Sequence, residues 1–132
     1  MNPQMLVIFN HSLTESQRTD ARHSLGVATF VAPPPELLAL WSQLPPDAPS
    51  LVPVLAPVFD WLAQTGRKGD FVLVQGEFGA TFLVAQKAQA LGLIPVYATT
   101  RREAVEQVCG DKVQLTHQFC HVRFRRYEIV PE

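Results

Sequence analysis

The sequence predicts an α/β fold with a mostly parallel sheet, and three observations support this prediction. Short apolar runs alternate with amphipathic stretches along the chain, as they do in strand–helix–strand crossovers. The clearest unit is residues 70–102, where the apolar runs 71–74 and 93–98 flank a helix-forming stretch at 80–91. The first of these runs contains no polar residue, which is typical of a strand covered on both faces. Right-handed crossovers between such strands place helices on both faces of the sheet.

The first half of the chain supplies two further strands and three helices. Thr14 and Gln17 form a capping-box pattern, which marks the start of a helix. Ser50 is the expected cap of a later helix, in which Pro57 should cause a kink or delay the start. The expected strands cover residues 5–9 and 27–31, and the expected helices cover residues 14–24, 35–44 and 50–64.

The last third of the chain departs from this alternation. Polar residues 99–102 should close the fourth strand, and two later stretches, 104–108 and 113–127, are separated by a Gly-Asp turn signal. We expect a C-terminal β-hairpin, with a short helix in place of its first strand as the alternative. Strict alternation along the last strand divides its side chains into two sets: Phe119, His121, Arg123, Arg125 and Tyr127 on one face, and Cys120, Val122 and Phe124 on the other.

Length and composition restrict the class of protein. A chain of 132 residues suits a single domain, residues 1–132. No apolar stretch is long enough for a membrane span, and the N-terminus lacks the basic region of a signal peptide, so we expect a cytoplasmic protein. Cys109 and Cys120 have no CxxC spacing, which predicts free thiols and no zinc site.

The charge is nearly balanced but unevenly distributed. A net charge of −1 does not indicate a partner such as a long nucleic acid. The basic residues after position 100 could form a local patch for a phosphorylated ligand, and a solvated strand face is the alternative. They are Arg101, Arg102, Lys112, Arg123, Arg125 and Arg126.

Three polar segments follow strands of the predicted sheet. In parallel α/β sheets, ligands bind beyond the carboxyl ends of the strands where the strand order reverses, and we expect the first and third strands to be neighbours there. The candidate ligand-binding residues are Asn10 and Ser12; Gln75, Gly76, Glu77, Phe78, Gly79 and Ala80; and Thr99, Thr100 and Arg102. His11, Thr81 and Arg101 lie among them and are the candidate catalytic residues.

The glycine-containing segment between the third strand and its helix is the most informative loop. Gly76 and Gly79 permit a positive φ or a close approach to a ligand, and the helix that follows directs its free N–H groups at the loop. This arrangement predicts an anion site, with a turn that serves packing only as the alternative. The loop has no lysine of a Walker motif and does not match GxGxxG.

The candidate chemistry uses few side chains. His11 could donate to a phosphate or act as an acid or base, or it could cap the next helix. Arg101 is a candidate phosphate clamp. Glu77 is the one carboxylate of the central loop, and no cluster with metal-ligand spacing and no Gly-x-Ser-x-Gly elbow is present, so we expect no metal and no cofactor. Cleavage of a phosphodiester without metal could use the ribose 2′-hydroxyl of the substrate as the nucleophile.

Five segments in this order, FNHSLT, LWSQLPPD, KGDFVLVQGEFGATF, LGLIPVYATTRR and HVRFRRY, resemble a small stand-alone family of CRISPR-associated proteins. That family is similar to CARF domains, the CRISPR-associated sensors with a Rossmann-like fold. The resemblance implies a ring nuclease of a type III CRISPR system, which linearises a cyclic oligoadenylate, cyclic tetra-adenylate above all, and so switches off antiviral signalling.

The resemblance also implies how the protein works. It implies a homodimer, a ligand that lies across the two-fold axis over the strand ends, and metal-independent RNA cleavage that leaves 2′,3′-cyclic phosphate ends. The role of His11, Thr81 and Arg101 as the active set is our inference, and Phe78 could stack on an adenine. Two alternatives are a binding protein of the same fold that sequesters the messenger without cutting it, and an unrelated Rossmann-like nucleotide-binding enzyme.

Overall fold

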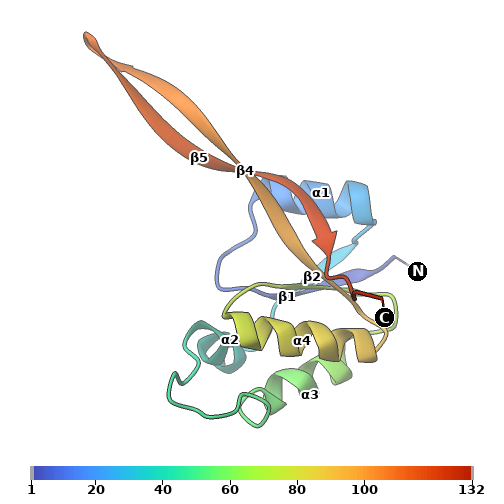
Figure 1. Ribbon diagram of the computed structural model, residues 1–132. Coiled ribbons are helices and arrows are strands. Elements are labelled where there is room, and N and C mark those ends of the chain that lie inside the picture. The colour runs from blue at the N-terminus through green and yellow to red at the C-terminus, as the bar shows by residue number, and fades with distance from the viewer. Residues whose placement is uncertain (1, 132) are drawn as a thin grey trace.

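The computed structural model describes residues 2–131, apart from the side chains of residues 107 and 109. It contains one five-stranded sheet with the strand order β2-β1-β3-β4-β5, and helices that connect the parallel strands (Figure 1). In chain order the elements are β1 (Gln4–Ile8), α1 (Glu15–Leu25), β2 (Thr29–Val31), α2 (Pro35–Ser42), α3 (Ala56–Thr65), β3 (Phe71–Val74), α4 (Phe78–Ala90), β4 (Ile94–Cys109) and β5 (Lys112–Arg126).

The sheet is mostly parallel, as predicted. β1 pairs in parallel with both β2 and β3, and β3 pairs in parallel with β4. β5 returns antiparallel to β4 and completes a C-terminal hairpin. The predicted adjacency of the first and third strands is therefore confirmed, and the strand order reverses between them.

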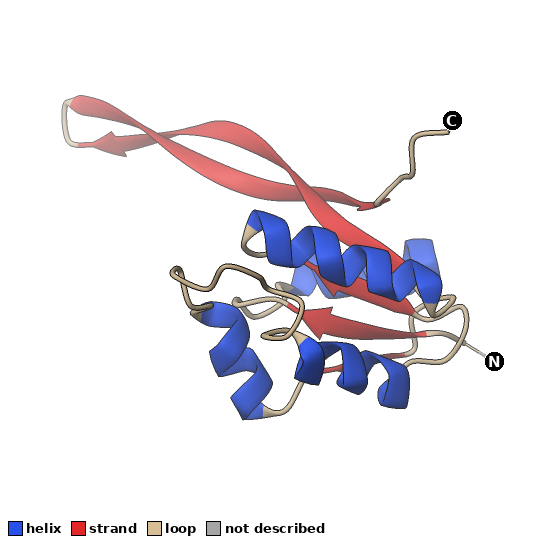
Figure 2. Ribbon diagram, turned by 60° about the horizontal axis from the view of Figure 1, so that its bottom comes forward, coloured by secondary structure: helices blue, strands red, loops and turns tan. Residues whose placement is uncertain are grey.

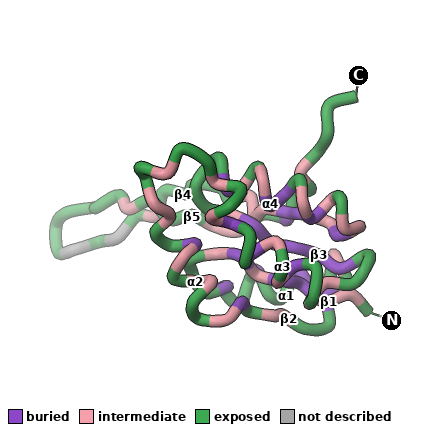
Figure 3. Tube along the Cα trace, turned by 90° about the horizontal axis from the view of Figure 1, so that it is seen from below, coloured by how far each residue is buried: buried purple, intermediate pink, exposed green. Residues whose placement is uncertain are grey.

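Helices cover both faces of the sheet, and each face has its own core (Figure 2). Leu6, Val72 and Val74 face α2, α3 and α4, whereas Met5 and Leu73 face α1. All residues of β3 are buried because helices lie on both sides of it, which explains its uninterrupted apolar sequence. The buried positions gather in these central strands, and the hairpin beyond them is largely exposed (Figure 3).

The capping box predicted for the first helix is confirmed. The Thr14 hydroxyl accepts a hydrogen bond from the Gln17 N–H, and the Gln17 side chain accepts one from the Thr14 N–H. Gly26 ends α1 in the left-handed conformation with φ of 72°, which glycine adopts without steric cost.

Two helix starts differ from the prediction. α3 begins at Ala56 rather than near Ser50, and its N-cap, Leu55, makes no side-chain capping bond. Pro57 lies in the first turn of α3, so the proline delays the helix instead of bending it. α4 begins at Phe78 because the Glu77 side chain caps it, two residues before the expected start.

β4 continues through the polar residues that were expected to end it. Residues 99–102 pair with β5, so they lie inside a long strand rather than in a loop, and the alternative of a short helix is wrong. The far part of the hairpin, residues 101–120, is here called the arm. It projects from the rest of the domain, here called the body (Figure 1).

A β-bulge at the base of the arm changes which residues share a face. Thr99 pairs with Arg123, but Thr100 pairs with His121, which leaves Val122 as an extra residue. The rings of His121 and Phe124 consequently pack together, with centroids 4.8 Å apart. The prediction of strict alternation, which placed these two residues on opposite faces, is therefore wrong.

Among the residues that the structure describes, no helix is both long enough and apolar enough to cross a lipid bilayer.

Candidate functional site

The carboxyl ends of β1 and β3 meet at one edge of the sheet, here called the strand-end edge. Asn10, from the segment after β1, and Gly76 and Glu77, from the segment after β3, line one cavity there of about 520 Å³. Trp41 of α2 forms part of its wall. The parallel pairing of β1 with β3 thus brings two of the three predicted polar segments together.

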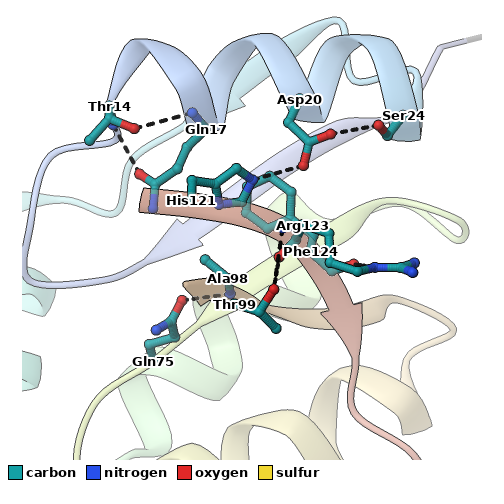
Figure 4. A network of polar contacts seen from close by, with 10 residues as sticks. All are labelled: Thr14, Gln17, Asp20, Ser24, Gln75, Ala98, Thr99, His121, Arg123 and Phe124. Carbon is teal, nitrogen blue, oxygen red and sulfur yellow. Dashed lines mark hydrogen bonds and ion pairs between the residues drawn. The ribbon is translucent and has the colours of Figure 1, made fainter. Parts of the chain in front are cut away.

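Gln75 fixes the segment that follows β3. Its backbone oxygen accepts a hydrogen bond from Nε1 of Trp41 at 2.9 Å, and its side-chain Oε1 accepts one from the backbone N–H of Ala98, also at 2.9 Å (Figure 4). One residue therefore ties the end of β3 to α2 and to β4. Both oxygens of Gln75 already have a protein partner.

Gly76 is needed for packing and not for an unusual backbone angle. Neither Gly76 nor Gly79 is among the glycines with positive φ. A Cβ atom on Gly76 would lie 2.7–2.9 Å from atoms of the Trp41 ring, so a larger residue would force the ring to shift. The close approach that we expected at this glycine is therefore made by an indole within the protein.

Glu77 occupies the anion position at the start of α4. Its carboxylate accepts hydrogen bonds from the backbone N–H groups of Gly79 and of Ala80, the second at 3.3 Å. These are the donors that we expected to hold a phosphate, and a carboxylate there is favoured by the same helix dipole. In this conformation the protein supplies its own anion at the predicted cradle.

His11 lies on the other side of β1. Together with Asn10 and Ser12 it lines a cavity of about 550 Å³ that extends toward β2 and includes Arg18. The imidazole is exposed and packs edge-on against the ring of Phe9, with centroids 5.2 Å apart. A histidine and an arginine thus share one open hollow, a combination that can bind an anion.

Thr81 and Phe78 line a third hollow, a groove of about 860 Å³ between α4 and the segment that follows β5. The Thr81 hydroxyl is buried and has no hydrogen-bond partner among the described residues. Phe78, by contrast, is 94% exposed at the start of α4. An exposed aromatic ring beside a groove can stack on a planar ligand.

Tyr127 closes the wall of this groove. Its hydroxyl donates a hydrogen bond to the backbone oxygen of Val74 at 2.6 Å, and its ring packs against that of Tyr97. Burial, with a smaller contribution from Tyr97, raises the pKa of Tyr127 to about 12. The phenol is therefore neutral near pH 7 and serves as a fixed donor.

The third predicted segment lies on the hairpin. The Thr99 hydroxyl accepts a hydrogen bond from the Arg123 N–H at 3.2 Å and donates one to the Arg123 carbonyl at 3.0 Å. Arg101 and Arg102 are exposed at the start of the arm, on opposite faces of β4. The cavities that hold His11 and Thr81 include neither arginine, so the three candidate catalytic residues lie on three different surfaces of one chain.

An ion pair at the base of the arm was not predicted. Nε2 of His121 lies 2.7 Å from Oδ2 of Asp20 on α1, and the His121 side chain is only 4% exposed (Figure 4). Partial burial raises the pKa of Asp20, but hydrogen bonds from Ser24 and His121 and the charges of His121 and Arg123 outweigh it and lower that pKa overall. The sequence gives a signal only for the short-range contact, the i, i+4 pair of Asp20 and Ser24.

No group of three or more His, Cys, Asp or Glu residues is placed to hold a metal ion among the side chains that the structure describes. Cys120 is a free thiol, and the side chain of Cys109 lies outside the described part of the chain.

Comparison with known proteins shows the family. Residues 3–125 match the sequence profile described as "Uncharacterized protein MJ1673 family". A relative from Methanocaldococcus jannaschii, "Uncharacterized protein MJ1673", is 40% identical over 125 residues, which covers 95% of this chain and 97% of the relative. No solved structure matches the chain. Because the match extends over nearly all of the body and the arm, the chain belongs to the MJ1673 family.

Proposed function

We propose that this protein is a ring nuclease of a type III CRISPR system, which binds a cyclic oligoadenylate, in the first place cyclic tetra-adenylate, and linearises it. The observation that carries the proposal is the parallel pairing of β1 with β3, which brings Asn10 and Glu77 to one cavity at the strand-end edge. Two of the five segments that resemble CARF-like proteins, FNHSLT and KGDFVLVQGEFGATF, meet at that edge. Ligands of parallel α/β sheets bind at such a reversal of strand order.

The chemistry that we propose needs no metal ion. The 2′-hydroxyl of one ribose attacks the adjacent phosphorus, the bond to the 5′-oxygen of the next nucleotide breaks, and a 2′,3′-cyclic phosphate and a 5′-hydroxyl result. The protein aligns the hydroxyl with the phosphorus and stabilises the charge that develops on the phosphate oxygens. His11, Thr81 and Arg101 are the candidate donors for this charge.

Ligand binding should move Glu77. A phosphate cannot reach the N–H groups of Gly79 and Ala80 while the carboxylate of Glu77 accepts from them. The negative charge of Glu77 also repels a polyanionic ring, so we expect the side chain to turn away when the ligand binds. The freed N-terminus of α4 would then act as the anion site.

A homodimer is part of the proposal. His11, Thr81 and Arg101 line different surfaces of one chain, so a single copy does not gather the candidate donors around one phosphate. A two-fold pair of strand-end edges could combine residues of one copy with those of the other across a symmetric ring.

The same separation favours a second candidate function. A protein that binds the cyclic messenger without cutting it needs complementary charge and stacking surfaces, such as Phe78, but no aligned catalytic set. This binding protein would share the fold and the site.

Single-turnover incubation of the purified protein with labelled cyclic tetra-adenylate in EDTA tests the proposal. Linear products with 2′,3′-cyclic phosphate ends are expected. Tight binding without product would favour the non-catalytic alternative, and no binding of rings of three to six adenylates would overturn both.

Two variants then assign roles within the site. His11→Ala should slow cleavage more than it weakens binding, and Arg101→Ala should weaken binding, because an arginine makes charged hydrogen bonds to phosphate. Matched controls are His23→Ala on α1 and Arg67→Ala, which precedes β3 at the opposite end of the strand. An unchanged single-turnover rate for His11→Ala would remove that residue from the mechanism, and full affinity for Arg101→Ala would remove the clamp.

A further inference from the structure

The arm leaves the body at the strand-end edge and has no cover within the chain. At about 3.3 Å per residue, residues 101–109 of β4 span roughly 30 Å. Figure 1 shows that no helix accompanies the far part of this ribbon. Isolated two-stranded ribbons are marginally stable in water unless an apolar face is packed against something. The arm therefore calls for a partner surface.

The register of the hairpin divides the arm into an apolar face and a polar face. The apolar face carries large side chains that are exposed: Val108 at 76%, Val113 at 60%, Leu115 at 64% and Phe119 at 71%. Apart from Val105, the opposite face carries polar or small side chains: Arg101, Glu103, Gln114, Thr116, Gln118 and Cys120. A ribbon with one exposed apolar face is typical of an interaction surface.

The apolar face is complementary to itself. Its three central cross-strand pairs are, in order along the arm, Arg102–Phe119, Ala104–His117 and Glu106–Leu115. A two-fold axis through the middle pair would place each arginine over the glutamate of a second copy and each phenylalanine over the leucine. The smallest side chain of this face, Ala104, would lie where the two copies approach most closely. Such reciprocal matching is the requirement of an isologous interface.

We propose that two copies of this chain associate through the apolar faces of their arms, packed face to face and antiparallel about the Ala104–His117 pair. In this arrangement Arg102 of each copy pairs with Glu106 of the other. Because each arm continues from a strand-end edge, antiparallel arms direct the two edges toward each other. The inference identifies the contact surface of a homodimer and rests on the register of the hairpin, so it does not depend on ring cleavage.

A charge exchange tests the pairing directly. Sedimentation velocity of the protein without nucleotide should show a dimer at micromolar concentration. Arg102→Glu places like charges opposite Glu106, and Glu106→Arg places like charges opposite Arg102, so each variant alone should dissociate about tenfold more readily. An equimolar mixture of the two variants should recover a dimer, since both ion pairs are then restored with reversed polarity. Both positions are exposed, so folding should be unaffected.

A second pair of variants tests the apolar contact. Leu115→Gln with Phe119→Gln should give a monomer, because both large side chains of the central pairs are replaced. The matched control on the opposite face, Gln114→Ser with Gln118→Ser, should remain dimeric. A wild-type protein that is monomeric at 100 µM, or charge variants that stay dimeric alone, or a mixture that stays monomeric, would each overturn the proposal.

These outcomes are separable from those of the cleavage assay. A dimer that responds to the charge exchange but does not cut any ring would leave the arm interface standing and refute the ring nuclease. Ring cleavage by a protein whose dimer ignores all arm variants would do the reverse.

Discussion

β3 and the arm are both β-structure, yet their side chains meet opposite environments. β3 is four apolar residues, all buried, because α1 lies on one face and α2–α4 on the other. The arm alternates apolar and polar residues and exposes both sets. The comparison shows that strand formation alone does not tell whether a strand contributes to the core. Burial by neighbouring elements decides it, and in the arm that neighbour would have to come from a second copy.

The same substitution in both regions gives the largest expected difference. Leu73→Ala removes a fully buried side chain of β3 and should lower the free energy of unfolding by about 2–5 kcal/mol, because it loses burial and leaves a cavity. Leu115→Ala, at an exposed arm position, should change it by less than about 0.5 kcal/mol at concentrations where the protein is monomeric. Urea denaturation followed by circular dichroism measures both.

This comparison would break if Leu115→Ala were as destabilising as Leu73→Ala in dilute monomer. Such a result would mean that the arm packs on the body of its own chain.

Gly76→Ala should give an intermediate effect within the body. The new methyl group would meet the Trp41 ring, which also donates to the Gln75 oxygen, so the ring must shift in a packed environment. We expect a loss of about 1–3 kcal/mol in the free energy of unfolding. The control is Gly79→Ala, where the nearest atom is the mobile Glu77 Oε1 at 3.1 Å and alanine suits a helix. Equal stability of Gly76→Ala and wild type would contradict the packing role of this glycine.

The smallest expected effect concerns the junction of body and arm. The pKa of Asp20 is lower in the folded protein than its ordinary value of 3.8, so its ionised form stabilises the folded state above about pH 4. That contribution is lost as the pH falls through the folded pKa. Asp20→Asn should therefore destabilise the protein at pH 7 by less than about 1 kcal/mol, and the difference from wild type should shrink at pH 3. Urea titrations at both pH values measure it, and an equal difference at the two would exclude the ion pair as the cause.

The candidate site was predictable only in part. The segments after β1 and β3 could be found because buried apolar runs and a glycine-containing turn mark strand ends, and their meeting followed from topology. The role of Glu77 as the cap of α4 and the contact of Trp41 with Gly76 were not predicted, since the first depends on local side-chain geometry and the second joins positions 41 and 76. The placement of Thr99–Arg102 was wrong because polar residues at a strand end and polar residues in an exposed strand look alike in sequence.

The sequence by itself determined the α/β class, the mostly parallel sheet, the capped first helix and the C-terminal hairpin. These features follow from local periodicity, caps and turn residues, which act over a few positions. Only the tertiary structure decided the bulge that brings His121 beside Phe124, the Asp20–His121 pair, and the continuation of β4 into an exposed arm. Each of these depends on contacts between segments far apart in the chain, and such contacts leave no periodic signal in either segment alone.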